Sequence, residues 1–230
     1  MTDSPLTQYL FENFDKVWPR VIEHLTLSGI SLAIALLISL PLGLLLSRVQ
    51  SLATPVLVIL GIIYTIPSFA LFGFLVSFTG IGAQPAIIAL TAYSLVVLVR
   101  NTMVAFNGVD PAVKEAARGM GMSPGQLLWR IEVPLALPVI VAGMRIATLS
   151  TIGLATIAAW IGAGGLGQLL KDSLSIFWVN PSKLYAGLIC IGLMAVGFDL
   201  IFRLLERQVS PPGATAKPAA ITRLTGPKEA

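Results

Sequence analysis

Long apolar runs alternate with short polar segments along this chain. Five runs are long enough to cross a bilayer, because a spanning helix needs about 20 largely apolar residues to cross a hydrocarbon core of roughly 30 Å. These runs are residues 25–46, 54–78, 85–106, 134–161 and 184–205. They are apolar all round and too long for the alternating strands of a closed barrel. The sequence therefore predicts an all-α integral membrane protein with about five transmembrane helices.

The first and second predicted spans contain residues that permit a kink. Pro41 and Gly43 fall in the first run, and Pro67 falls in the second. Proline frees a backbone carbonyl and permits a kink, which neighbouring helices must then satisfy. We expect such kinked helices to line a path through the membrane.

Polar segments flank the membrane region at both ends. Apolar residues recur at roughly helical spacing in residues 5–23, so we expect segment 1–24 to be an external amphipathic segment. It lacks a basic start followed by an apolar core, and we do not read it as a cleaved signal peptide. His24 is expected at the membrane interface. Segment 206–230 is rich in Pro, Ala and Gly, which predicts a disordered tail.

The number of charged residues limits the class of protein, and the distribution of the basic ones predicts the orientation of the chain in the membrane. Only 11% of the residues are charged and 56% are hydrophobic, against about 25% charged in soluble domains, which excludes a soluble enzyme or a nucleic-acid binder. Basic residues gather in cytoplasmic loops. One set of loops holds Arg48, Arg100, Lys114, Arg118, Arg130, Arg145, Arg203, Arg207, Lys217, Arg223 and Lys228. The other set holds Lys16, Arg20, Lys171 and Lys183. We therefore expect the N-terminus outside and the C-terminus in the cytoplasm.

The sequence contains few residues that could catalyse a reaction, bind a metal or form a disulfide. Cys190 and His24 are the single residues of their types, so an internal disulfide, a metal cluster or Ser/His catalysis is not expected. Asp199 precedes Arg203 by one helical turn, which favours a structural ion pair near the inner end of the last span. Arg145 either snorkels to the interface or meets Asp199.

A polar segment between the third and fourth spans predicts a helical hairpin. Asp110 and Pro111 are an N-cap and a first helical residue, and Gly121 suits a left-handed C-terminal position. A second helix begins at the Ser-x-x-Gln capping box of Ser123. We expect Pro134 to end that helix at the membrane.

The spacing within this hairpin carries a family resemblance. Residues 115–134 read EAARGMGMSPGQLLWRIEVP, and the matching positions are Glu115, Ala116, Ala117, Gly121, Ile131 and Pro134. The segment resembles the signature of ATP-binding-cassette importer permeases, with Val133 in place of the usual Leu. The resemblance implies a type I importer architecture over residues 25–205, in which these residues couple the permease to an ATPase. It also places this chain in the inner membrane and implies three kinds of partner: two ATP-binding subunits, a second permease copy or a paralogue, and an external substrate-binding protein.

A glycine run follows the fourth span. Gly162, Gly164 and Gly167 formally match a dinucleotide-binding fingerprint, but a membrane helix and not a strand is predicted before them. We expect this run, with Gly165, to be an outer docking or gating surface. The chain contains no GxxxxGK[ST] segment, so we expect no bound cofactor, with ATP and Mg²⁺ held by the partner ATPase and no enzymatic activity here.

Further motifs narrow the resemblance to osmoprotectant permeases. YTIPSFALFGFL near Tyr64, GVDP at 108–111 and TIGLATIAAWIGAGGLG at 151–167 resemble permeases for glycine betaine, choline and carnitine. Aromatic faces hold quaternary ammonium groups, so Tyr64, Phe69 and Tyr93, with Pro67, are candidates for the translocation path. Two alternatives stay open: a permease for another solute, such as an amino acid or sulfonate, and a secondary transporter or channel.

Overall fold

The computed structural model describes residues 12–175 and 181–209, and every regular element in these ranges is a helix. In chain order they are α2 (Phe14–Arg48), α3 (Gln50–Thr65), α4 (Ser68–Thr79), α5 (Ala83–Asn107), α6 (Pro111–Gly119), α7 (Pro124–Leu127), a π-helical turn (Leu128–Glu132), α8 (Val133–Ala158), a 3₁₀ turn (Ala159–Ile161), α9 (Gly167–Ser175) and α10 (Pro181–Val209). The parts of the expected N-terminal segment and tail in 1–11 and 210–230 lie outside the described residues. The all-α membrane fold is as predicted.

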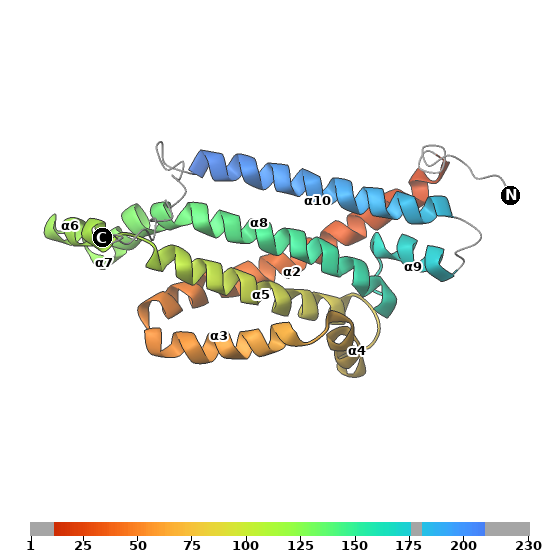
Figure 1. Ribbon diagram of the computed structural model, residues 1–230, viewed down its shortest axis with the longest axis horizontal. Coiled ribbons are helices and arrows are strands. Elements are labelled where there is room, and N and C mark those ends of the chain that lie inside the picture. Colours follow the sequence, from red (N-terminus) through yellow and green to blue (C-terminus); the bar gives the residue numbers. More distant parts are fainter. Residues whose placement is uncertain (1–11, 176–180, 210–230) are drawn as a thin grey trace, which may run out of the picture.

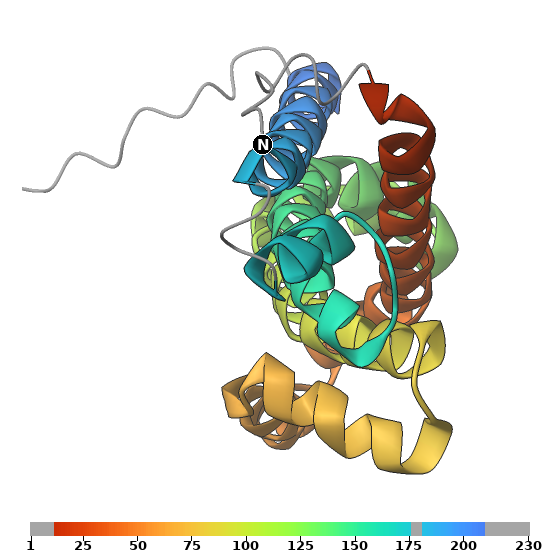
Figure 2. The same ribbon diagram turned by 90° about the vertical axis from the view of Figure 1, so that its right-hand side faces the viewer.

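The long helices form an elongated bundle with two distinct ends (Figure 1). We call the end that carries α6 and α7 the hairpin end, and α9 lies at the opposite end. Within residues 12–175 and 181–209, four helices are long and apolar enough to cross a membrane, or five spans result if the bent pair α3 and α4 counts as one. Viewed along the bundle, α3 and α4 lie on one side and α10 on the other (Figure 2).

The first span differs from its prediction. α2 begins at Phe14 and continues without a break through the segment expected to lie on the membrane surface. The reason is long-range packing: His24 is fully buried, and its Nε2 lies 3.0 Å from the Ile152 carbonyl of α8. His24 therefore packs inside the bundle against α8, and its position at the membrane interface stays a prediction.

The second predicted span, residues 54–78, is broken. α3 and α4 meet at an angle of 94°, because Pro67 disfavours the helical region for Ile66, which adopts ψ 127. The break leaves the Ile66 carbonyl outside the helical ladder, and the Tyr93 hydroxyl donates to it at 2.5 Å. A kink at Pro67 was expected, and the structure makes it a right-angled corner.

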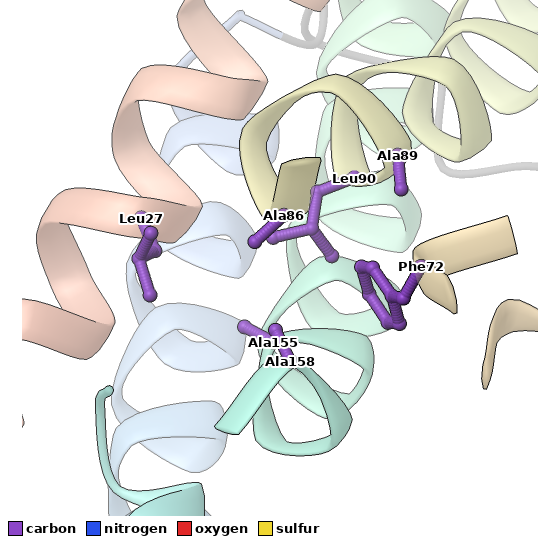
Figure 3. Close-up of a cluster of buried hydrophobic side chains, with 7 residues drawn as sticks. All are labelled: Leu27, Phe72, Ala86, Ala89, Leu90, Ala155 and Ala158. Atoms are coloured by element: carbon purple, nitrogen blue, oxygen red, sulfur yellow. The ribbon is translucent and has the colours of Figure 1, made fainter. Parts of the chain in front are cut away.

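Alanines let the helices pack closely near the α9 end of the bundle. One cluster joins four helices, with Leu27 from α2, Phe72 from α4, Ala86, Ala89 and Leu90 from α5, and Ala155 and Ala158 from α8 (Figure 3). Alanine lets helix backbones approach closely, which is how helices pack in lipid, where apolar burial alone gives no preference. α8 and α5 also approach closely at Gly143, where an added Cβ would lie 2.5 Å from the Asn101 side chain.

The periphery is apolar and open. Only 6% of the residues in the most apolar 18-residue stretch of α10 are buried. Ile62 of α3 and Phe74 and Phe78 of α4 are also exposed. A surface of this kind requires lipid or another membrane protein around it. This exposed apolar surface agrees with the prediction of a membrane protein.

Candidate functional site

The hairpin is residues 110–134, and its first helix begins as the sequence predicts. The Asp110 carboxylate accepts a hydrogen bond from the Ala112 amide at 2.8 Å, and Pro111 is the first helical residue. α6 ends where Gly121 takes a φ of +81°, a left-handed value that favours glycine. The amide of Gly121 donates to the Arg118 carbonyl at 2.9 Å. The chain therefore turns sharply without an unsatisfied helix end.

A capping box starts the second helix. The backbone amide of Gln126 donates to the Ser123 hydroxyl oxygen at 3.3 Å. The backbone amide of Ser123 donates to the side-chain oxygen of Gln126 at 2.8 Å. Both hydrogen bonds of the predicted box are present. A cap of this kind contributes about 1 kcal/mol, which matters for a helix as short as α7.

Pro134 does not end the second helix, contrary to the prediction. The helical path runs from Pro124 to Ile161, with a π-helical turn at Leu128–Glu132 just before Pro134. Proline lacks an amide and its ring crowds the carbonyl four residues earlier. The wider π-helical turn accommodates both effects. The hairpin is thus continuous with α8, so movement of one reaches the other.

The outer surface of the hairpin is exposed and partly apolar. Glu115 and Ala116 are exposed, whereas Ala117 is 2% exposed and packs inside the chain. Met120 and Trp129 are 72% and 71% exposed. Large exposed apolar side chains such as Met and Trp are typical of a protein interface. Met120 and Trp129 were not selected from the sequence, because nothing in the pattern separates them from apolar residues facing the bundle.

A buried carboxylate lies at the base of the hairpin. Glu132 is fully buried; Arg48 at the end of α2 donates to its Oε2, and Lys114 Nζ of α6 lies 3.7 Å from its Oε1. Sequence reasoning missed this cluster. A usable signal existed, since Glu132 is the single acidic residue between Glu115 and Asp172.

The glycine turn, residues 162–167, lies at the opposite end. Gly162, Gly164 and Gly165 have φ values of +77°, +81° and +76°, and the Gly165 amide donates to Glu23 Oε2 of α2 at 2.8 Å. Glu23 also pairs with Arg20 at 2.8 Å. α8 and the 3₁₀ turn precede the glycines, so the arrangement differs from the strand–turn–helix of a dinucleotide site. The start of α2 holds this turn in place.

The aromatic candidates are only partly brought together. The rings of Tyr64 and Tyr93 meet edge to face with centroids 5.9 Å apart. Pro67 forms the corner between α3 and α4, and Phe69 lies beyond it on α4, 58% exposed. Tyr64 is half exposed and offers an aromatic face at the corner, whereas Tyr93 is buried and its hydroxyl bonds the Ile66 carbonyl. Phe69 faces outward from this chain.

A charged cluster joins α8 to α10. Arg145 Nε donates to Asp199 Oδ1 at 2.5 Å and Arg203 Nε donates to Oδ2 at 2.7 Å. Arg145 Nη1 also lies 3.5 Å from Glu206. The expected Asp199–Arg203 pair is confirmed, and of the two alternatives for Arg145 the contact with Asp199 is the one found.

Removing one member of this cluster should destabilise the protein. We expect Asp199→Leu to lower the melting temperature in detergent micelles, because Arg145 then lacks its main counter-charge in an apolar setting. The double substitution Arg145→Met with Asp199→Leu should recover most of the loss, since the charge that Asp199 compensates is removed with it and the side chain of its other partner, Arg203, is 57% exposed. A double variant less stable than the single one would contradict this explanation.

A bundle of spanning helices that presents a capped, exposed hairpin at one end is a multi-pass membrane protein built to contact other subunits. The chain belongs to the family of binding-protein-dependent transport system inner membrane components, whose model matches residues 16–211. Membership makes it a transport permease subunit of the inner membrane. An ATP-binding subunit and a substrate-binding protein are the partners that such a system implies.

Named relatives match most of the chain. It is 35% identical over 208 residues to the choline transport system permease protein OpuBB of Bacillus subtilis, covering 90% of this chain and 95% of that protein. It is 40% identical over 210 residues to the osmoprotectant import permease protein OsmW of Salmonella typhimurium, covering 89% and 97%. Among solved structures, a chain of the inward-facing MetNI methionine ABC transporter matches with a TM-score of 0.77 and 25% identity, covering 91% of this chain and 100% of that one.

Proposed function

We propose that this permease subunit imports a quaternary ammonium osmoprotectant, such as choline, glycine betaine or carnitine, at the expense of ATP. The observation that carries the substrate class is the similarity to permeases named for these solutes, such as the glycine betaine/carnitine/choline permease protein OpuCB of Bacillus subtilis, 35% identical over 89% of this chain. The exposed ring of Tyr64, which rests against the buried Tyr93, supports it, because aromatic faces attract quaternary ammonium groups. Tyr64, Pro67, Phe69 and Tyr93 are the proposed translocation path.

The hairpin is the proposed contact with the ATPase subunit. Glu115 and Ala116 offer an exposed carboxylate and a low surface, and Gly121 sets the turn between α6 and α7. Ala117, Ile131 and Pro134 would support this surface from behind and carry movement into α8. ATP and Mg²⁺ bind the ATPase, and this chain holds no cofactor and hydrolyses nothing.

The proposed orientation places the hairpin in the cytoplasm. The hairpin end holds six basic residues of the described chain, namely Arg48, Lys114, Arg118, Arg130, Arg203 and Arg207, and the α9 end holds four, namely Lys16, Arg20, Lys171 and Lys183. The excess of basic residues marks the inner side. The N-terminus is then external, the C-terminus cytoplasmic, and the glycine turn with Gly162, Gly164, Gly165 and Gly167 is open to the external binding protein.

The working assembly is proposed to contain two permeases and two ATPases. The exposed apolar side chains of α3 and α4 require covering, and a second copy of this chain or a paralogue provides it alongside membrane lipid. Nucleic acid has no role in this assembly.

Uptake into proteoliposomes tests the function. The purified permease, reconstituted with its ATPase subunit and binding protein, should accumulate labelled choline only when ATP and Mg²⁺ are supplied. Excess unlabelled glycine betaine or carnitine should compete, and methionine or a sulfonate should not. Competition by methionine alone would favour the amino-acid alternative, and uptake driven by an ion gradient without ATP would favour a secondary transporter.

A further inference from the structure

The buried carboxylate at the base of the hairpin sits where three moving parts would meet. Glu132 ends the π-helical turn that joins α7 to α8. Arg48 ends α2, and Lys114 lies in the middle of α6. One side chain therefore touches a spanning helix and the first helix of the hairpin, while its backbone belongs to the second.

The two cationic partners are held unequally. Arg48 makes a direct hydrogen bond to Oε2. Lys114 lies 3.7 Å from Oε1, and its Nζ instead donates to the Phe106 carbonyl at the end of α5, at 3.1 Å. Within the described part of the chain Oε1 accepts no hydrogen bond. The Lys114 ammonium is therefore shared between two acceptors, and a small shift of α6 is enough to tighten or release its contact with Glu132.

The surroundings leave room for such a shift. α6 packs chiefly on α7 and the π-helical turn rather than on the spanning helices. A groove of about 680 Å³ separates α2 from the hairpin and is lined by Pro41, Leu45, Arg48, Arg118, Met122 and Leu127. π-helical turns inside helices frequently occur at functional sites. A buried carboxylate must keep a cation close, since an unpaired buried charge is costly.

We propose that Glu132 is the positioning residue that passes movement of the hairpin to α2 and α8, with Lys114 as its adjustable partner. The inference rests on the proposed function, because it requires that an ATPase moves the hairpin. As α6 shifts, Lys114 exchanges between the Phe106 carbonyl and Glu132, and the carboxylate moves Arg48 and the end of α2 with it. The exchange involves hydrogen bonds and ion pairs only, and no covalent bond changes.

Glu132→Gln tests this role, because it keeps the size and removes the charge. In proteoliposomes we expect the variant complex to assemble and hydrolyse ATP, while the amount of choline imported per ATP falls on the order of tenfold, a common size for coupling between two sites. A purely structural role would lower hydrolysis and uptake together and leave the ratio unchanged. Glu206→Gln is the matched control: it makes the same change in the Arg145 cluster and should keep the ratio.

A double-mutant cycle identifies the partner. Lys114→Gln should lower the ratio in the same direction, and the double variant should be no worse than Glu132→Gln alone, because the two residues act through one contact. If Glu132→Gln fails to insert into the membrane, the amount of choline imported per ATP by the Lys114→Gln complex tests the proposal instead. An unchanged ratio in assembled Lys114→Gln and Glu132→Gln complexes would overturn the role of Glu132. Absence of ATP-driven uptake in the unmodified complex would contradict the proposed function instead.

Discussion

Replacing Gly121 by valine should abolish uptake while the protein still inserts into the membrane. Gly121 has φ +81° and a Cβ there would meet nothing within 4 Å, so the cost comes from the backbone and not from a clash. Left-handed backbone costs an ordinary residue about 1–2 kcal/mol, and a β-branched one more. The turn should relax to another conformation and aim α6 differently. Uptake of labelled choline, membrane content and co-purification with the ATPase measure the outcome.

Neighbouring residues provide the comparison for Gly121. Gly119→Ala adds a methyl group at the last residue of α6, two positions before Gly121. No left-handed backbone is required there and a Cβ would meet no atom within 4 Å, so uptake should stay near the unmodified level. Glu115→Lys reverses an exposed charge and should also abolish uptake with the fold intact. Normal uptake and normal co-purification in Gly121→Val and Glu115→Lys would count heavily against the hairpin as the coupling element.

Replacing Gly167 by alanine should damage the opposite end of the bundle. A Cβ at Gly167 would lie 2.0 Å from the Thr156 carbonyl oxygen and 2.8 Å from its carbon, both backbone atoms. Relief requires the start of α9 to move away from α8. Overpacking of this kind costs about 1–3 kcal/mol, and we expect the upper part of that range because backbone and not a flexible side chain is in the way. The melting temperature in detergent and the yield of folded protein measure the effect.

Gly153 offers a matched control within α8. A Cβ there would meet no atom within 4 Å, so Gly153→Ala should keep the melting temperature. If Gly167→Ala were as stable as Gly153→Ala, the close approach of α9 to α8 would be wrong.

Local signals in the sequence were sufficient for the hairpin. Asp110, Gly121 and Ser123 act on groups within a few residues of themselves, so spacing alone predicts what they do. The same holds for Asp199 and Arg203, which lie one turn apart on one helix. The resemblance in residues 115–134 then led to the family that the comparisons show.

Long-range contacts were beyond the reach of these signals. Nothing near His24 in the sequence shows that α8 covers it, and Glu132 looks like part of a polar loop until Arg48 reaches it from α2. At Pro67 and Pro134 the sequence indicates only that a normal helix cannot continue. Whether the chain then turns a corner or inserts a π-helical turn depends on neighbours such as Tyr93, which satisfies the carbonyl left free at the corner.

One helix touches both candidate sites. α2 binds the glycine turn through Glu23 near its start and binds Glu132 through Arg48 at its end. Its residues 24–48 span about 36 Å at 1.5 Å per residue. A helix of that length links the glycine turn directly to the base of the hairpin. Under the proposed function, docking of the binding protein at one end and closure of the ATPase pair at the other would both act on α2, so displacing one end would strain the other.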